Sequence, residues 1–244
     1  MGKRWLIGLM MLFLVVGSVY AQGSAEVAFN KGMDYFKKGM YDKAILKFTK
    51  AIKINPNYSN AYNNRGLAYA KKGYNNRAIT DYSKAIETNP DNAQAYDNRA
   101  LAYYKKGSYD QAIADYTKII EKNPNDAEAY NKRAFAYYNT GSYDQAISDY
   151  SKVIKIRPND AAAYNDRGNA YYKKDNYDQA ISDFSKVIEI NPDNVRMYNK
   201  LAIVYFFKQD YDKSWENVKK AQDSGFRVHL EFIEDLKKAS GRER

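Results

Sequence analysis

The chain has 244 residues, contains no cysteine and carries a formal net charge of +10. The lack of cysteine excludes disulfides, thiolate metal sites and cysteine nucleophiles, and the single His229 cannot form a histidine metal cluster by itself. Because the 29 acidic residues are interleaved with the 39 basic ones, we expect a solvated basic surface rather than a nucleic-acid-binding stripe. We predict no cofactor and no bound metal.

The first 21 residues have the three parts of a secretory signal peptide. Lys3 and Arg4 precede an apolar stretch over residues 5–16, and Ala21 is the small residue at the end. The apolar stretch is short for a membrane-spanning helix, which needs about 20 residues. We therefore predict that residues 1–21 are cleaved and that the protein is exported, to the periplasm or beyond the cell. The alternative is an uncleaved membrane anchor.

The rest of the chain repeats one pattern. All five prolines are 34 residues apart, at positions 56, 90, 124, 158 and 192. Each copy contains two stretches with apolar residues at helical spacing, such as Tyr96, Ala100 and Tyr103 followed by Ala112 and Tyr116. One helix pair cannot bury both of its faces, so a fixed period over six copies predicts a solenoid of stacked pairs.

Turn residues mark where the predicted helices begin and end. Gly107 suits the left-handed conformation that ends a helix, and Pro124 ends the second helix because its ring prevents continuation. Ser142 with Gln145 has the spacing of a capping box. Asn125 is predicted to cap the helix that follows the proline.

We expect six helix pairs and one further helix. The predicted units span about residues 25–58, 59–92, 93–126, 127–160, 161–194 and 195–226. Residues 227–239 carry an apolar helical face and are predicted to cover the last exposed core, as the ends of solenoids require. Residues 240–244 are predicted to be a frayed tail.

Several features of each copy resemble the tetratricopeptide repeat. They are the small residue followed three later by tyrosine (Gly66 and Tyr69), the alanine that opens the second helix (Ala78), the aromatic four residues on (Tyr82) and the closing proline. The resemblance covers about residues 25–226. It implies an all-α fold, a right-handed superhelical solenoid in which the first helix of each pair lines a concave groove.

Four copies place an arginine on the buried stripe of the first helix and an aspartate before the aromatic of the second. In the first copy these positions hold Lys31 and Lys47, and in the last they hold Leu201 and Asn217. Because arginine and aspartate appear and disappear together, we predict an ion pair within each of the four units. The alternative is that the arginines bind ligand phosphates. The predicted pairs are Arg65–Asp81, Arg99–Asp115, Arg133–Asp149 and Arg167–Asp183.

Other residues of the first helices project away from the core, and the resemblance places them on the concave face. Asparagine can pair with the backbone of an extended guest, and aromatic side chains provide a large contact area. We predict a peptide-binding groove, although these residues could instead merely follow the repeat consensus. The predicted groove residues are Asn63, Asn64, Leu67, Asp97, Asn98, Leu101, Tyr104, Asn131, Phe135, Tyr138, Asn165, Asn169, Tyr172, Asn199 and Phe206.

Some tetratricopeptide repeat proteins clamp a C-terminal carboxylate with lysines, asparagines and an arginine from three successive repeats. Asn169 fits one asparagine position of that clamp, but Asn165 stands where the first lysine belongs. Lys200 replaces the asparagine of the next repeat. We therefore do not expect this clamp.

Motifs for enzymatic chemistry are missing from the sequence. It contains no glycine-rich phosphate loop, no strand-elbow serine and no histidine–glutamate metal motif. We expect a non-enzymatic scaffold that binds a peptide segment or helix of a partner protein, in envelope assembly or secretion. The alternatives are a binder of anionic envelope polymer or nucleic acid, through lysines such as Lys71, Lys105 and Lys173, or a membrane-tethered adaptor.

Overall fold

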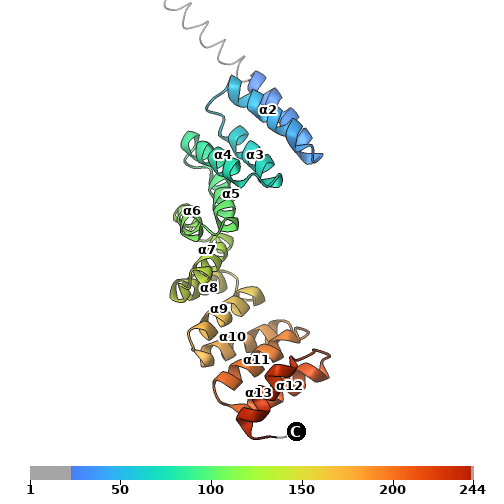
Figure 1. Ribbon diagram of the computed structural model, residues 1–244. Helices are drawn as coiled ribbons and strands as arrows, with labels where there is room; N and C mark the ends of the chain where they lie inside the picture. Colours follow the sequence, from blue (N-terminus) through green and yellow to red (C-terminus); the bar gives the residue numbers. More distant parts are fainter. Residues whose placement is uncertain (1–22, 243–244) are drawn as a thin grey trace, which may run out of the picture. The chain divides into compact units, whose positions relative to one another are not determined.

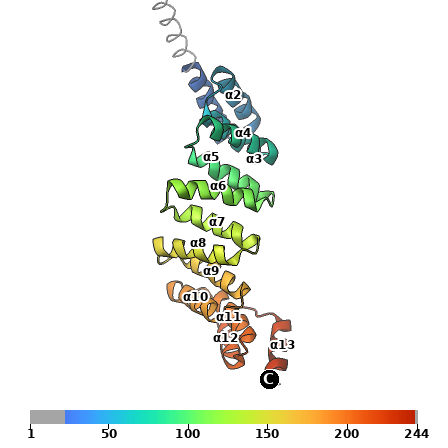
Figure 2. The same cartoon turned by 90° about the vertical axis from the view of Figure 1, so that its left-hand side faces the viewer.

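A computed structural model describes residues 23–242, and all regular secondary structure in this range is helical (Figures 1 and 2). The predicted signal peptide, residues 1–21, lies outside the described residues. For the described residues, the predicted all-α fold is confirmed. The chain divides into two compact units, Met1–Lys122 and Asn123–Arg244. We refer to them as the N-terminal unit and the C-terminal unit and describe each by itself.

Over its described residues, 23–122, the N-terminal unit forms three helix pairs in which consecutive helices pack side by side (Figure 1). The first pair is held together by Phe29 and Phe48, whose ring centroids lie 5.6 Å apart. The helices span residues 23–37, α2 (Tyr41–Ile54), α3 (Ser59–Lys71), α4 (Asn75–Thr88), α5 (Ala93–Lys105) and α6 (Tyr109–Lys122).

The C-terminal unit also contains three helix pairs, and one more helix follows them. This last helix is α13, drawn in red at the C-terminal end of Figure 1. The helices are α7 (Ala127–Asn139), α8 (Tyr143–Ile156), α9 (Ala161–Lys173), α10 (Tyr177–Ile190), α11 (Arg196–Phe207), α12 (Tyr211–Asp223) and α13 (Leu230–Ser240).

The turns within the helix pairs have a common conformation. Gly107 has a φ of 75°, in the left-handed region that glycine adopts without steric cost. Asp175 and Gln209 adopt the same region at the corresponding positions of the last two pairs, with φ of 58° and 65°. At the other end of each pair, the second helix ends shortly before the proline, as α8 does at Ile156.

Two of the predicted helix caps are wrong. The side chain of Ser142 does not cap α8, and its hydroxyl instead accepts a hydrogen bond of 3.0 Å from Thr140 Oγ1. Asp126, not Asn125, caps α7. Its carboxylate accepts hydrogen bonds of 3.0 Å from the backbone N–H groups of Glu128 and Ala129.

Small residues allow the two helices of a pair to approach closely. A Cβ atom added at Gly66 would lie only 2.7 Å from Cε1 of Tyr82, and one at Gly168 would lie 2.7 Å from Cε1 of Phe184. Tyr82 and Phe184 are themselves buried. The aromatic ring of the second helix therefore occupies the space that a larger residue on the first helix would need.

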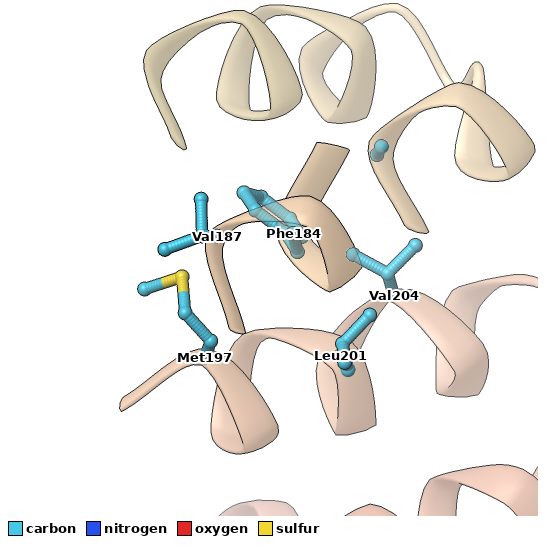
Figure 3. Packing of buried hydrophobic residues seen from close by; sticks show 6 residues of the cluster. Phe184, Val187, Met197, Leu201 and Val204 are labelled. Atoms are coloured by element: carbon cyan, nitrogen blue, oxygen red, sulfur yellow. The ribbon is translucent and has the colours of Figure 1, made fainter. Parts of the chain in front are cut away.

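Neighbouring pairs bury apolar residues between them. Figure 3 shows Phe184 and Val187 of α10 packed against Met197, Leu201 and Val204 of α11. Each of these five side chains is buried. The second helix of one pair thus shares its core with the first helix of the next, as stacking requires.

The last helix covers the end of the C-terminal unit. Val228 and Leu236 are buried in one cluster with Ala202 and Val218. Trp215 Nε1 also donates a hydrogen bond of 3.1 Å to the hydroxyl of Ser240. The apolar face noted in the sequence of residues 227–239 therefore packs against the final helix pair.

Candidate partner-binding surface

Each of the four predicted arginines lies against the predicted aspartate of its own pair. Arg167 Nε and Nη2 donate to Asp183 Oδ2 and Oδ1 at 2.9 and 2.7 Å, a bidentate contact between α9 and α10. Asp183 is only 3% exposed. The other three pairs, Arg65–Asp81, Arg99–Asp115 and Arg133–Asp149, have the same geometry with distances of 2.7–2.8 Å.

The same arginine also reaches the preceding repeat. Arg167 Nη1 donates a hydrogen bond of 2.9 Å to Ser151 Oγ on α8, and the guanidinium lies 5.6–5.8 Å from the ring centroids of Tyr164 and Tyr171. The hydrogen bond and the negative charge of Asp183 raise the pKa of Arg167. Internal groups therefore satisfy the guanidinium, which argues against a ligand-binding role. Equivalent contacts join Arg65 to Thr49 and Arg99 to Ser83.

In the N-terminal unit, two asparagines of the predicted groove form a hydrogen bond with each other. Asn98 Nδ2 donates to Asn63 Oδ1 at 2.9 Å, across neighbouring repeats. Asn63 is only 2% exposed, so its prediction as a groove residue is wrong because a guest cannot reach it. Asn64 Nδ2 donates to the backbone carbonyl of Asn60 at 2.8 Å, within its own helix.

In the C-terminal unit, Lys200 takes the place of the donor asparagine. Its Nζ donates to Asn165 Oδ1 at 2.7 Å and to Asn169 Oδ1 at 2.8 Å, and it lies 5.1 Å from the ring centroid of Phe184. Asn165 Nδ2 in turn donates to Asp166 Oδ1 at 2.8 Å. Burial lowers the pKa of Lys200 and raises that of Asp166. Asn165 and Asn169 are thus held by internal partners.

Two apolar residues of the predicted groove are exposed, and the other apolar ones are half-buried. Leu101 on α5 is 43% exposed and Phe135 on α7 is 48% exposed. In the N-terminal unit, Leu67, Leu101 and Ala102 are among the residues that line a hollow of about 140 Å³. We call six exposed or half-buried apolar residues of the first helices the first-helix face. They are Leu67, Leu101 and Tyr104 in the N-terminal unit and Phe135, Tyr138 and Tyr172 in the C-terminal unit.

Aromatic neighbours hold several of these rings in place. Tyr104 lies 5.1 Å from Tyr109, and Tyr138 lies 5.3 Å from Tyr143, both edge-on. Each pair joins the end of a first helix to the start of the second helix. The rings are therefore positioned before any guest binds.

Models of the tetratricopeptide repeat match most of the chain. The model described as TPR repeat matches residues 32–73, 72–107, 100–141 and 137–175, and the model described as Tetratricopeptide repeat matches residues 161–194. The chain belongs to the tetratricopeptide repeat family. The family resemblance noted in the sequence is confirmed, and the protein is a helix-pair scaffold for protein–protein interaction.

Solved structures of tetratricopeptide repeat proteins share this fold. Two structures of the MamA protein are 29% and 31% identical to this chain, with TM-scores of 0.66 and 0.62, covering 70% and 66% of this chain and 94% of each MamA chain. A tetratricopeptide repeat protein from Parabacteroides merdae ATCC 43184 is 21% identical over 90% of this chain and 88% of its own, with a TM-score of 0.69.

A further similar structure is that of YrrB, described as a TPR protein with an unusual peptide-binding site. It is 23% identical to this chain, and the match covers 78% of this chain and 97% of the YrrB chain with a TM-score of 0.67. No curated protein is significantly similar to this chain. At this level of identity, the YrrB and Parabacteroides structures show the repeat fold only.

The other predicted groove residues are less accessible than the exposed members of the first-helix face. Asp97, Asn131 and Asn199 are half-buried on α5, α7 and α11. Phe206 is also half-buried, and its ring centroid lies 5.5 Å from that of Phe232 on α13. Phe206 therefore belongs to the packing of the end helix in this tetratricopeptide repeat protein.

Residues 23–242 contain no cluster of three acidic or histidine side chains that could hold a metal ion. His229, at the start of α13, is exposed. Within the same range, every helix is too short or too polar to cross a membrane.

Proposed function

We propose that the protein is a non-enzymatic scaffold that binds a peptide segment or an amphipathic helix of a partner protein on its first-helix face. The observation that carries the proposal is the exposure of Leu101 and Phe135, one on a first helix of each unit. In the N-terminal unit, the amides of Asn98 and Asn63 are already paired with each other. Covering these apolar side chains removes them from water, which lowers the free energy of the complex and so favours binding.

The fixed polar groups support this role. The contacts of Lys200 with Asn165 and Asn169, and of Asn98 with Asn63, tie neighbouring first helices together within each unit. A surface that is already ordered spares the ordering cost of binding. We propose that the apolar residues provide the affinity, while the amides keep the face rigid.

The first-helix face can be tested by capture of partners from the envelope fraction. We expect the full-length Leu101→Ala, Phe135→Ala double variant to retain about a tenth of the captured partner, because truncating a residue at the centre of an interface costs about 1 kcal/mol or more when that residue is a hot spot. Crosslinking followed by quantitative mass spectrometry measures the captured amount.

Leu46→Ala is the matched control. Leu46 is 69% exposed but lies on α2, a second helix, so its truncation is expected to leave capture unchanged. The proposal is wrong if the double variant captures as much partner as the wild type. It is also wrong if capture falls steeply with salt in both, since that dependence is typical of polyanion binding.

We also propose that the protein is exported and acts in envelope assembly or secretion. The support is the charged start, short apolar stretch and small residue in the sequence of residues 1–21. N-terminal sequencing of the protein from the envelope fraction is expected to start at Gln22. A chain that keeps residues 1–21 in the membrane fraction would support the tethered adaptor instead.

A further inference from the structure

A row of ion pairs joins the turns of neighbouring repeats. A cation that follows a first helix contacts the aspartate at the second position of the preceding second helix, as Lys72 does with Asp42. We call this row the turn ladder. Its other ion pairs are Lys174–Asp144, Lys208–Asp178 and, from the second residue after α13, Arg242–Asp212.

One contact of the turn ladder in the N-terminal unit lacks a carboxylate. Lys106 Nζ donates to Asn76 Oδ1 at 2.6 Å, and Asn76 stands where α2, α8, α10 and α12 have aspartate. The first turn of α4 contains no acidic residue at all. The positive charge of Lys106 is therefore met by an amide, whereas the other cations of the ladder face a negative charge.

Arg77 adds a second positive charge beside this contact. Its guanidinium lies 5.7 Å from the ring centroid of Tyr69 and 5.5 Å from that of Tyr74. Within residues 23–242 it makes no hydrogen bond or ion pair, so its N–H donors are available. The two rings hold the guanidinium without using those donors, which match a carboxylate in a bidentate contact.

These groups line one surface hollow. It has a volume of about 590 Å³, and its walls contain two cations and two amides but no acidic residue. Lys72, which lies 5.3 Å from the ring centroid of Tyr74, is already paired with Asp42. The lining residues are Gly73, Tyr74, Asn75, Asn76, Arg77 and Lys106.

We infer that this hollow binds a carboxylate side chain of the partner protein, between Lys106 and Arg77. The inference rests on the proposed scaffold function and assigns an acidic residue to the partner. The guest carboxylate would supply the charge that Asp42 or Asp144 supplies elsewhere in the turn ladder. That internal use of aspartate favours a carboxylate over a phosphate. The hollow is formed by the α3–α4 turn, the start of α4 and Lys106. Leu101 of the first-helix face does not line it, although Asn75 lines both this hollow and the smaller one beside Leu101.

The test uses the ¹⁵N-labelled full chain and a blocked peptide of alternating Glu and Ser, with an alternating Gln and Ser peptide as the neutral probe. The acidic peptide is expected to shift the amide signals of Asn76, Arg77 and Lys106, and the neutral peptide is not. Asn76→Asp restores the internal carboxylate and is expected to weaken binding about fivefold, the size of one exposed ion pair. Arg77→Gln is expected to weaken binding to a similar extent.

Asp144→Asn is the matched control. It gives Lys174 the same amide partner, but the next residue is Gln145, so no comparable binding is expected there. The inference fails if Asn76→Asp binds as the wild type does, if Asp144→Asn creates equal binding, or if inorganic phosphate displaces the peptide at lower concentration than acetate does. Leu101→Ala with Phe135→Ala should leave this titration unchanged, so the hollow and the first-helix face can fail separately.

Discussion

Replacing Asp183 by alanine is expected to lower the free energy of unfolding by about 3 kcal/mol, the lower end of the cost of breaking a buried ion pair. The side chain of Asp183 is 5% exposed and that of Arg167 is 19% exposed. Without the carboxylate, the guanidinium keeps one neutral acceptor, Ser151, and the Tyr164 and Tyr171 rings. Urea unfolding followed by circular dichroism measures the loss.

A double-mutant cycle separates the pair from its surroundings. The combined Arg167→Leu, Asp183→Leu variant leaves no unpaired charge, so it is expected to lose less stability than the two single changes added together. If the stability loss of the double variant equals the sum of the losses of the two single variants, Arg167 and Asp183 are not energetically coupled. Hydrogen exchange of the α9 and α10 amides shows whether the damage is confined to this helix pair.

Replacing Phe184 by alanine is expected to cost about 3–5 kcal/mol, as other buried aromatic truncations do. Phe184 fills the space between Gly168 and the next repeat, where Val187, Met197 and Leu201 surround it (Figure 3). Neither Gly168 nor Met197 can fill the space that the ring leaves without a shift of the helices. The same urea titration measures this effect.

Phe184→Tyr is the matched control for this position. Other repeats have tyrosine there, and Tyr82, Tyr116 and Tyr150 are as buried as Phe184. We expect Phe184→Tyr to change the stability by less than about 1.5 kcal/mol, as volume-conserving changes usually do. A large loss for tyrosine and a small one for alanine would show that the ring does not hold the repeats together.

The period of the sequence was sufficient to predict the helix pairs. Each proline removes a backbone donor at a fixed interval, and Gly107 provides the left-handed turn, so local chemistry sets these boundaries. The Arg167–Asp183 contact was also predictable, because the two residue types vary together among the copies. In a repeat protein, the copies can be compared with one another, so residues that vary together reveal contacts.

The candidate site was harder to predict because the same residue type can serve a guest or a neighbouring repeat. Asn63 was predicted to face a ligand, yet it accepts a hydrogen bond from Asn98. The signal that could have revealed this is the 35-residue separation of complementary groups, Asn98 with Asn63 and Lys200 with Asn165. The partner of such a side chain lies one repeat away, so it is missed when the residues of a single repeat are considered alone.

The bridging role of the arginines also bears on how such a chain can grow. The unit of residues 59–92 directs Arg65 to Thr49 of the preceding unit and offers the Ser83 hydroxyl to Arg99 of the following one. A gene segment encoding one full period therefore carries the docking groups for both of its junctions. Duplication or deletion of whole periods leaves each of these guanidinium groups with its acceptors, whereas a cut at another point separates an arginine from its aspartate. We therefore expect changes in length by whole repeats to be tolerated best.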